Sequence, residues 1–166
     1  MGYDLSGKQG SFRFNVFGWR HVLKLAEMYG WKPKGTKLNR GYILMRCEEN
    51  EEKTDEIMNN WDGNYFNNSY QRVSAKDAIN LSIALEKALP DIPDKPVHEE
   101  MPNYHKITEG GAFDLSAPEE KIEEMVSAAM RGEDSTNKSP LEFFSGYRQK
   151  VIDFIEYCKS GRFAIG

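Results

Sequence analysis

Apolar side chains recur every three or four residues in four stretches of the chain, a period typical of amphipathic helices. The first stretch predicts a helix over residues 16–29. Asn15 is a suitable N-cap, and Gly30 follows the last turn, where glycine commonly ends a helix. The side chains expected on its buried face are Trp19, Val22, Leu23, Ala26 and Tyr29.

The second stretch predicts a helix over residues 75–89. Ser74 and Asp77 resemble a capping box, with aspartate in place of the usual glutamate. Ile79 and Ile83 form a second apolar stripe, nearly opposite the main one. Since a helix that is apolar on two sides is usually covered on both, we expect this helix to lie between other elements.

The remaining two helices follow a proline-rich connector at residues 90–102. One is predicted over residues 117–131. The other is predicted as one continuous helix, which starts at Ser139 with a capping box to Glu142 and ends at Gly161.

Shorter segments between these helices predict a minor amount of β structure. An acidic stretch at residues 48–55 is expected to be solvated and to become helical toward Met58. The four expected strands cover residues 11–14, 42–47, 70–73 and 162–165.

The chain is therefore predicted to form a single compact domain, residues 1–166, that is mainly α with minor β structure. A length of 166 residues is enough to bury one hydrophobic core. The second and fourth helices are expected to form the central pair. The loop at residues 61–73 is expected to pack near the N-terminus and the first helix.

Composition and charge narrow the possible functions. With 22 basic and 26 acidic residues, the formal net charge is −4. Binding to the phosphates of nucleic acid needs a basic surface, so this class of partner is disfavoured. No apolar run approaches the length of a membrane span. Two cysteines, without a CxxC motif or a secretory signal, indicate a reducing compartment, and we expect a cytoplasmic protein.

The sequence contains no recognisable catalytic motif or phosphate-binding loop. His98 and His105 lie near two glutamates, but their spacing matches no common metal site. Asp62 opens a segment similar to a calcium loop, but Asn67 and Val73 occupy the positions that need glycine and an acid. The sequence thus predicts no metal and no cofactor, and it favours a protein that is not an enzyme.

A segment rich in aromatic and amide side chains is the best candidate for a recognition surface. Trp, Tyr and Asn make specific polar contacts around an apolar anchor in many interfaces. The same residues also suit a structural loop, with the rings in the core and the asparagines in turns. The candidate residues for binding a partner or ligand are Asp4, Trp19, Trp61, Asp62, Asn64, Asn67, Tyr70 and Gln71.

Several segments resemble a loose set of uncharacterised bacterial proteins that begin Met-Gly-Tyr-Asp-Leu, as this chain does at residues 1–5. The resemblance implies a bacterial origin and a shared fold, and it implies no activity. Relative to that set, residues 38–60 are expected to be an insertion. The other similar segments are residues 17–19, 30–36, 61–65, 73–78 and 151–165.

Two hypotheses for function follow from these observations. The leading one is a small cytosolic binding or interaction protein without catalytic activity, in a regulatory or defence role. The alternative is an enzyme or small-ligand-binding protein, so the partner is either a protein or a small molecule. The pocket of the alternative would lie among Asp4, Trp19, Asp62, Asn64 and Gln71.

Overall fold

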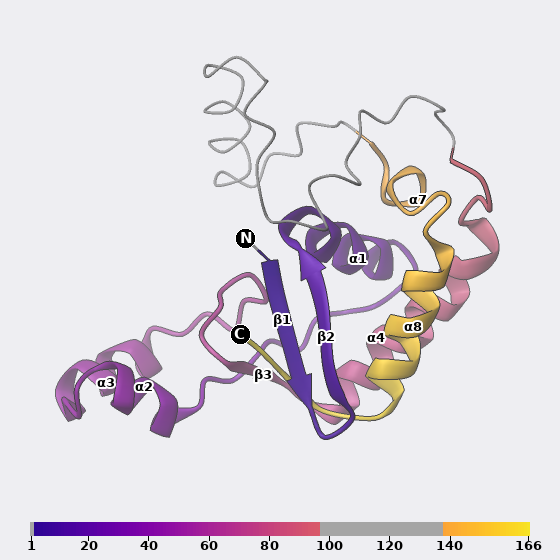
Figure 1. Cartoon of the computed structure of the whole chain (residues 1–166). Coiled ribbons are helices and arrows are strands. Elements are labelled where there is room, and N and C mark those ends of the chain that lie inside the picture. The colour runs from indigo at the N-terminus through magenta and orange to yellow at the C-terminus, as the bar shows by residue number, and fades with distance from the viewer. Residues whose placement is uncertain (1, 97–137) are drawn as a thin grey trace, which may run out of the picture.

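The computed structural model describes residues 2–96 and 138–166, and these residues form an α+β fold with a helical majority (Figure 1). The chain begins with a hairpin of two strands, and two short strands come later. The strands are β1 (Gly2–Gly7), β2 (Gly10–Asn15), β3 (Gln71–Val73) and β4 (Phe163–Ile165).

The helices vary in length from a single turn to about four turns. A short 3-10 helix, η1, continues directly from α4. The helices are α1 (Val16–Met28), α2 (Arg40–Arg46), α3 (Glu51–Asn59), α4 (Ala75–Ala88), η1 (Leu89–Asp91), α7 (Pro140–Phe143) and α8 (Arg148–Lys159).

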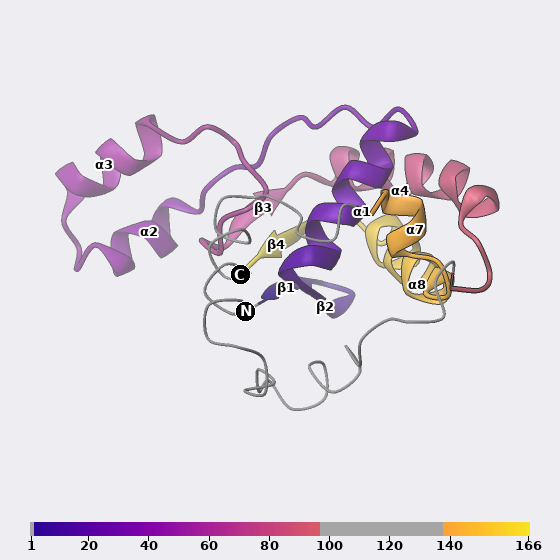
Figure 2. The ribbon, with the colours of Figure 1, turned by 90° about the horizontal axis from the view of Figure 1, so that it is seen from above.

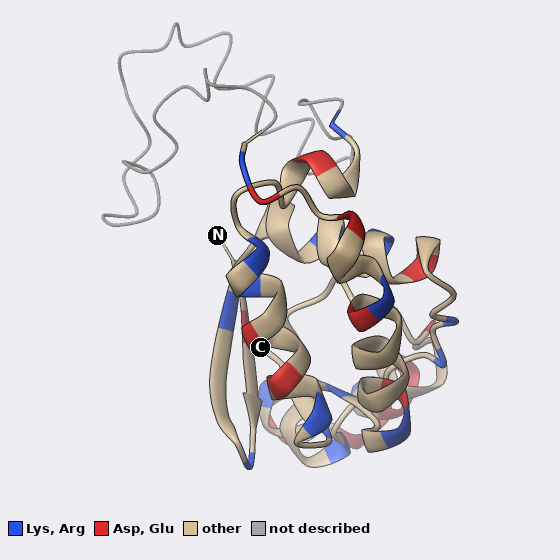
Figure 3. Cartoon of the chain, turned by 90° about the vertical axis from the view of Figure 1, so that its right-hand side faces the viewer, with Lys and Arg blue, Asp and Glu red and all other residues tan. Residues whose placement is uncertain are grey.

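The four strands form one antiparallel sheet in the order β2-β1-β4-β3. Leu5 of β1 pairs with Phe12 of β2 on one side and with Ile165 of β4 on the other. Side chains alternate between the two faces, as the pleat requires. Leu5 and Ile165 are buried, whereas Asp4 and Arg13 are exposed. Figure 3 shows the helices on one side of the sheet, so no helix of the described residues covers the polar face.

The sequence predicted three of these strands to within a residue or two, namely β2, β3 and β4. It missed β1, a six-residue strand whose two buried positions, Tyr3 and Leu5, are too few to give a clear alternating pattern between the flanking glycines. The strand expected at residues 42–47 was wrong, because this segment lies in and beside helix α2. Ile43 and Cys47 are its buried positions, four residues apart, so the true period is helical.

The single helix predicted from Ser139 to Gly161 was also wrong, because the structure has two helices there. It is divided into α7 and α8 by a turn at Gly146, whose φ of 77° is a conformation that glycine adopts without steric cost. The Gly146 N–H donates to the Pro93 carbonyl at 3.1 Å instead of continuing the helix. The predicted capping box of Ser139 and Glu142 is confirmed.

Helix α4 packs along α8, and this pair forms the most extensive helix contact in the described part of the chain. The predicted central pair is therefore confirmed. The expectation that α4 is covered on both sides was wrong, because Ile79 and Ile83 are 43% and 44% exposed. Their stripe faces solvent, while the main stripe around Leu81 and Leu85 is fully buried.

The core between the sheet and the helices is built around Phe154 of α8. Its ring makes edge contacts with Phe14 at 4.9 Å and with Trp19 at 6.0 Å between centroids. Phe12 and Phe163 pack on it from the sheet at 5.4 and 6.4 Å. This aromatic cluster joins β2, β4, α1 and α8, and thus locks the N-terminal hairpin to the C-terminal end of the chain.

Helices α2 and α3 form an arm that projects from the rest of the molecule (Figures 1 and 2). The arm corresponds to residues 38–60, which the sequence analysis expected to be an insertion. Arg40 of α2 binds both Glu51 and Asp55 of α3 and holds the two helices together. The arm has a small hydrophobic cluster of its own, made of Leu38, Ile43 and Cys47 with Tyr42, Met58 and Trp61 against it.

Two expectations fall wholly or partly outside the described residues. The helix predicted at residues 117–131 lies outside them. The connector at residues 90–102 is described only as far as Pro96, and Ile92 within it is buried.

Both cysteines are free and buried, Cys47 in the arm and Cys158 in the core. Burial raises the pKa of the Cys158 thiol above its ordinary value of 9.0. Burial likewise raises the pKa of Tyr157 from 10.0 to about 12. In both groups the folded state favours the protonated form, so their contribution to stability is complete below the unfolded-state pKa and is lost at higher pH.

We therefore expect the free energy of unfolding to fall as the pH rises above about 9, where the unfolded thiol begins to ionise and the folded one does not. Urea unfolding at a series of pH values measures this decline. In the variant Cys158→Ala the decline should begin only near pH 10, where unfolded tyrosine ionises. An identical pH dependence in the two proteins would contradict the account.

Candidate functional site

The loop at residues 61–70 is fastened to the N-terminal part of the molecule by hydrogen bonds to its backbone. Trp19 Nε1 donates to the Tyr65 carbonyl at 2.7 Å, and the Tyr3 hydroxyl donates to the Phe66 carbonyl at 2.8 Å. The predicted packing of this loop near the N-terminus and α1 is therefore confirmed. Trp19 is fully buried, so its indole holds the loop from inside the core.

A buried carboxylate fastens the same loop to helix α4. Asp77 has no exposed surface, and it accepts hydrogen bonds from Trp31 Nε1 at 3.1 Å and from the Tyr65 hydroxyl. Burial, together with the bond to Asp77, raises the pKa of Tyr65 well above its ordinary value. Tyr65 therefore stays protonated and acts as a donor.

This arrangement corrects the capping box predicted for Ser74 and Asp77. Ser74 is the N-cap, and its hydroxyl accepts from the Asp77 N–H at 3.2 Å. The Asp77 side chain points instead to Trp31 and Tyr65. Half of the motif is thus present, and the carboxylate joins three separate segments of the chain.

The residues Asp62 and Asn64 shape the start of the loop. Asp62 Oδ1 accepts hydrogen bonds from the backbone N–H of Asn64 at 3.0 Å and from its side-chain amide. These two bonds hold the pKa of Asp62 below its usual range. Asn64 Oδ1 in turn accepts from the N–H groups of Phe66 and Asn67. These are the local side-chain bonds of a turn, as the sequence indicated.

Gln71 is fully buried and closes the other end of the loop. Its Oε1 accepts from the Ser69 N–H at 2.9 Å, and its Nε2 donates to the Asn67 carbonyl. Asp4 lies on the open face of the sheet, where its carboxylate is 3.5 Å from the Arg13 guanidinium. Trp19 and Gln71 present no surface to a ligand, so Asp4, Trp19 and Gln71 share no exposed pocket.

Two of the predicted residues, Trp61 and Asn67, do line a common depression. It is an open groove of about 410 Å³ between the arm and the 61–70 loop. Trp61 is half-buried, and its Nε1 donates to the Thr36 carbonyl at 3.0 Å, which fixes the ring in place. We call this depression the arm groove; its lining is Leu38, Ile43, Lys53, Glu56, Ile57, Asn60, Trp61, Asn67 and Ser69.

Tyr70 lies beside this region and braces the arm against the sheet. Its φ of 51° is left-handed, which is uncommon for a residue with a side chain. Its ring packs on Tyr42 of α2 with centroids 4.6 Å apart. A side chain at Gly166 would collide with the same ring, at 2.9 Å. Tyr70 is 45% exposed, so the ring is both a support and part of the surface.

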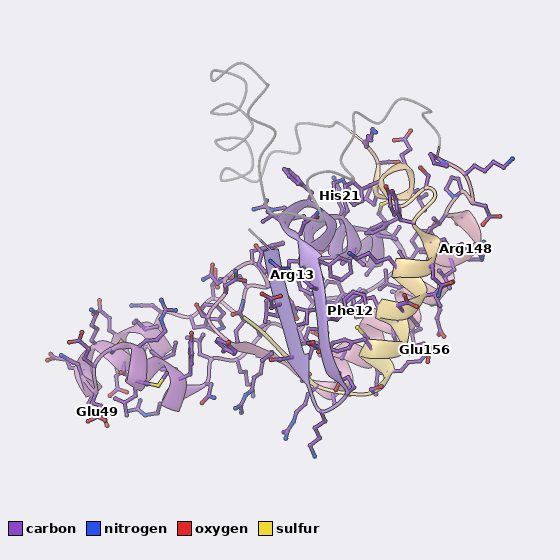
Figure 4. All side chains as sticks on the ribbon, viewed as in Figure 1. Phe12, Arg13, His21, Glu49, Arg148 and Glu156 are labelled. Atoms are coloured by element: carbon purple, nitrogen blue, oxygen red, sulfur yellow. The ribbon has the colours of Figure 1, made fainter. Side chains whose placement is uncertain are left out.

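The arm groove combines an apolar base with a polar rim, and it lies beside an acidic stretch of the arm. Ile57 is 37% exposed and offers the apolar contact surface, while Lys53, Glu56 and Asn60 are exposed around it. Residues 48–56 contain six acids and one lysine. Arg40 neutralises two of these acids, so the outer side of α3 keeps a negative excess. Glu49 marks this outer end of the arm in Figure 4.

Sequence reasoning missed the arm as part of the site. It predicted a strand where α2 lies, and it treated residues 38–60 as an insertion, so Leu38, Ile43 and Ile57 were not considered. A usable signal was present, because Lys53, Glu56, Ile57 and Asn60 are spaced as one face of a helix. The candidate site thus shifts from the loop with Asp4 and Trp19 to the groove between the loop and the arm.

No cluster of three or more metal-ligating side chains exists in the part of the chain that the structure describes. The pair His98 and His105 lies outside that part. Within residues 2–96 and 138–166, no helix has the length and apolar content needed to cross a bilayer.

Comparison of the chain with models of known protein families, with curated proteins and with solved structures finds no match. The resemblance to a set of bacterial proteins therefore stays a prediction. The geometry of the arm groove and the chemistry of its lining are the features that bear on function.

Proposed function

We propose that the protein is a cytosolic interaction protein that binds a segment of another protein in the arm groove. The observation that carries this proposal is the groove itself, in which a fixed Trp61 and an exposed Ile57 lie next to amide side chains and beside the acidic stretch at residues 48–56. The segment bound there would insert one apolar side chain and would carry basic residues on both sides of it.

The chemistry of the groove supports this choice of partner. Trp is enriched among residues that dominate binding energy, especially where neighbouring groups keep water out. The acids around residues 48–56 favour a basic segment, because complementary charge speeds association and disfavours wrong partners. Two free, buried cysteines are consistent with the reducing cytosol.

The loop and the arm would have different roles in binding. Trp19, Asp77 and Gln71 hold the loop from below, so one wall of the groove is fixed before a partner arrives. A fixed wall lowers the entropic cost of association. The arm has only a small cluster of its own, so the second wall can adjust to the partner.

A pair of synthetic peptides tests the proposal. One has a central leucine flanked by lysines, and the other has the same leucine flanked by glutamates. Titration into the isotopically labelled protein should shift the amide resonances of Ile57, Asn60, Asn67 and Ser69 with the basic peptide only. The affinity should fall as salt is added, because the attraction is partly electrostatic.

Two results would count against the proposal. Equal binding of the acidic and basic peptides would show that the acids of the arm do not select a basic partner. Resonance shifts confined to residues outside the arm groove would place binding elsewhere on the molecule.

A further inference from the structure

Strand β2 forms one edge of the sheet, and within the described residues it pairs with β1 alone. The register runs without interruption from Gly2 opposite Asn15 to Gly7 opposite Gly10, so β2 contains no bulge. It also contains no proline. Bulges, prolines and inward charges are the usual devices that keep an edge strand from pairing with another chain.

The direction of each backbone group on β2 follows from the neighbouring pair of strands. The Asp4 N–H donates to the Gly166 carbonyl at 2.9 Å, and the Gly166 N–H donates back to Asp4 at 2.8 Å. Asp4 therefore faces β4, and by alternation Leu5 faces β2. Leu5 is opposite Phe12, so Phe12 faces β1, and Ser11 and Arg13 direct their N–H and C=O groups outward.

The side chains along this edge do not protect it. Ser11 is small and exposed, and the Arg13 guanidinium is drawn toward Asp4 on the adjacent strand. Phe12 packs against Phe154 and Tyr157 on the helix side, yet it remains only partly buried. Figure 4 labels Phe12 and Arg13 on this outer strand.

We propose that β2 pairs with β2 of a second copy of the chain, antiparallel and about a two-fold axis at Phe12. Ser11 would then exchange two backbone hydrogen bonds with Arg13 of the second copy, and Arg13 would do the same with Ser11 of the second copy. The two four-stranded sheets become one continuous sheet. A two-fold contact of this kind is closed and self-complementary.

Three features of the chain favour this register. Each Arg13 is placed opposite a serine and not opposite another arginine, so no like charges face each other. The two Phe12 rings lie opposite each other on the helix side, and each covers apolar surface that the single chain leaves partly open. All outward backbone groups of Ser11 and Arg13 gain partners.

The oligomeric state of the full-length protein is the first test, measured by sedimentation over a range of concentrations. We expect a monomer–dimer equilibrium. The variant Ser11→Pro removes an outward donor without touching the bonds to β1, and should weaken dimerisation at least about tenfold. The matched control Ser11→Thr keeps the N–H and should dimerise as the native chain does. A protein that stays monomeric at every concentration overturns the proposal.

Cross-linking tests the register without proline. A mixture of the variants Ser11→Cys and Arg13→Cys should form a disulfide-linked heterodimer under mild oxidation, since these positions lie opposite each other. Ser11→Cys alone should link poorly, because two copies of residue 11 are diagonal neighbours. The native cysteines are buried and do not compete. Equal linking of the single variant and the mixture would overturn the proposed register.

Discussion

Replacing Asp77 with alanine is expected to lower the free energy of unfolding by about 2–6 kcal/mol, because two buried donors lose their acceptor and each such loss costs about 1–3 kcal/mol. The change removes the acceptor of Trp31 Nε1 and of the Tyr65 hydroxyl and leaves both donors buried. Urea unfolding gives the free energy directly, provided that the slope of the transition is unchanged.

The matched control for Asp77 is Ser74→Ala, three residues earlier on the same helix. It removes only the N-cap bond to the Asp77 N–H and should cost about 1 kcal/mol. If the two variants lost the same stability, the hydrogen bonds of Asp77 to Trp31 and Tyr65 would contribute no more than the N-cap bond does. The network with Trp31 and Tyr65 would then not hold the loop.

Replacing Trp19 with alanine should have an effect of similar size. The fully buried indole contacts the rings of Tyr3, Phe14 and Phe154. Its removal leaves a large cavity, and substitutions of this kind cost about 3–5 kcal/mol. Thermal and urea unfolding followed by circular dichroism measure the loss.

The variant Trp19→Phe separates packing from hydrogen bonding at the same position. It keeps an aromatic ring in the core but removes the donor to the Tyr65 carbonyl. We expect it to cost less than the alanine variant and to increase hydrogen exchange in the 61–70 loop, because the loop loses an anchor. Unchanged exchange in that loop would show that Trp19 acts through packing alone.

The sequence was most informative where one residue determines a local geometry. Asn15 and Ser74 cap their helices by side-chain bonds, and the capping box at Ser139 forms as predicted. Such signals depend only on neighbours within four residues, so they can be read from the sequence.

The sequence was misleading where contacts between distant residues determine the local structure. Asp77 has the position of a capping acid, but its carboxylate binds two rings from segments 12 and 46 residues away in the chain. Gly146 interrupts an otherwise helical pattern because its N–H binds the Pro93 carbonyl. The apolar run from Ile43 to Met45 is compatible with a strand or a helix. It lies in helix α2, and Ile43 and the C-cap residue Cys47 both pack into the hydrophobic cluster of the arm.

Of the candidate site residues, the structure brings Trp61 and Asn67 together in the arm groove. Aromatic and amide side chains drew attention to the 61–70 loop, which is held by hydrogen bonds from Tyr3 and Trp19 and to Asp77. Residue type alone did not show that the Trp19 ring is a buried anchor in α1, whereas the Trp61 ring is partly exposed. That distinction depends on the arm, which lies beside the loop only in the folded chain.

Two exposed isoleucines show whether recognition takes place in the arm groove. Ile57 lines the groove, whereas Ile79 lies on α4; they are 37% and 43% exposed. The measurement is the Kd of the lysine-flanked leucine peptide for Ile57→Ser and for Ile79→Ser, with unfolding free energies as a control. We predict that Ile57→Ser weakens binding about tenfold, as expected for the loss of one buried apolar side chain, and that Ile79→Ser leaves it unchanged. Equal affinities in the two variants would show that the peptide does not bind in the arm groove.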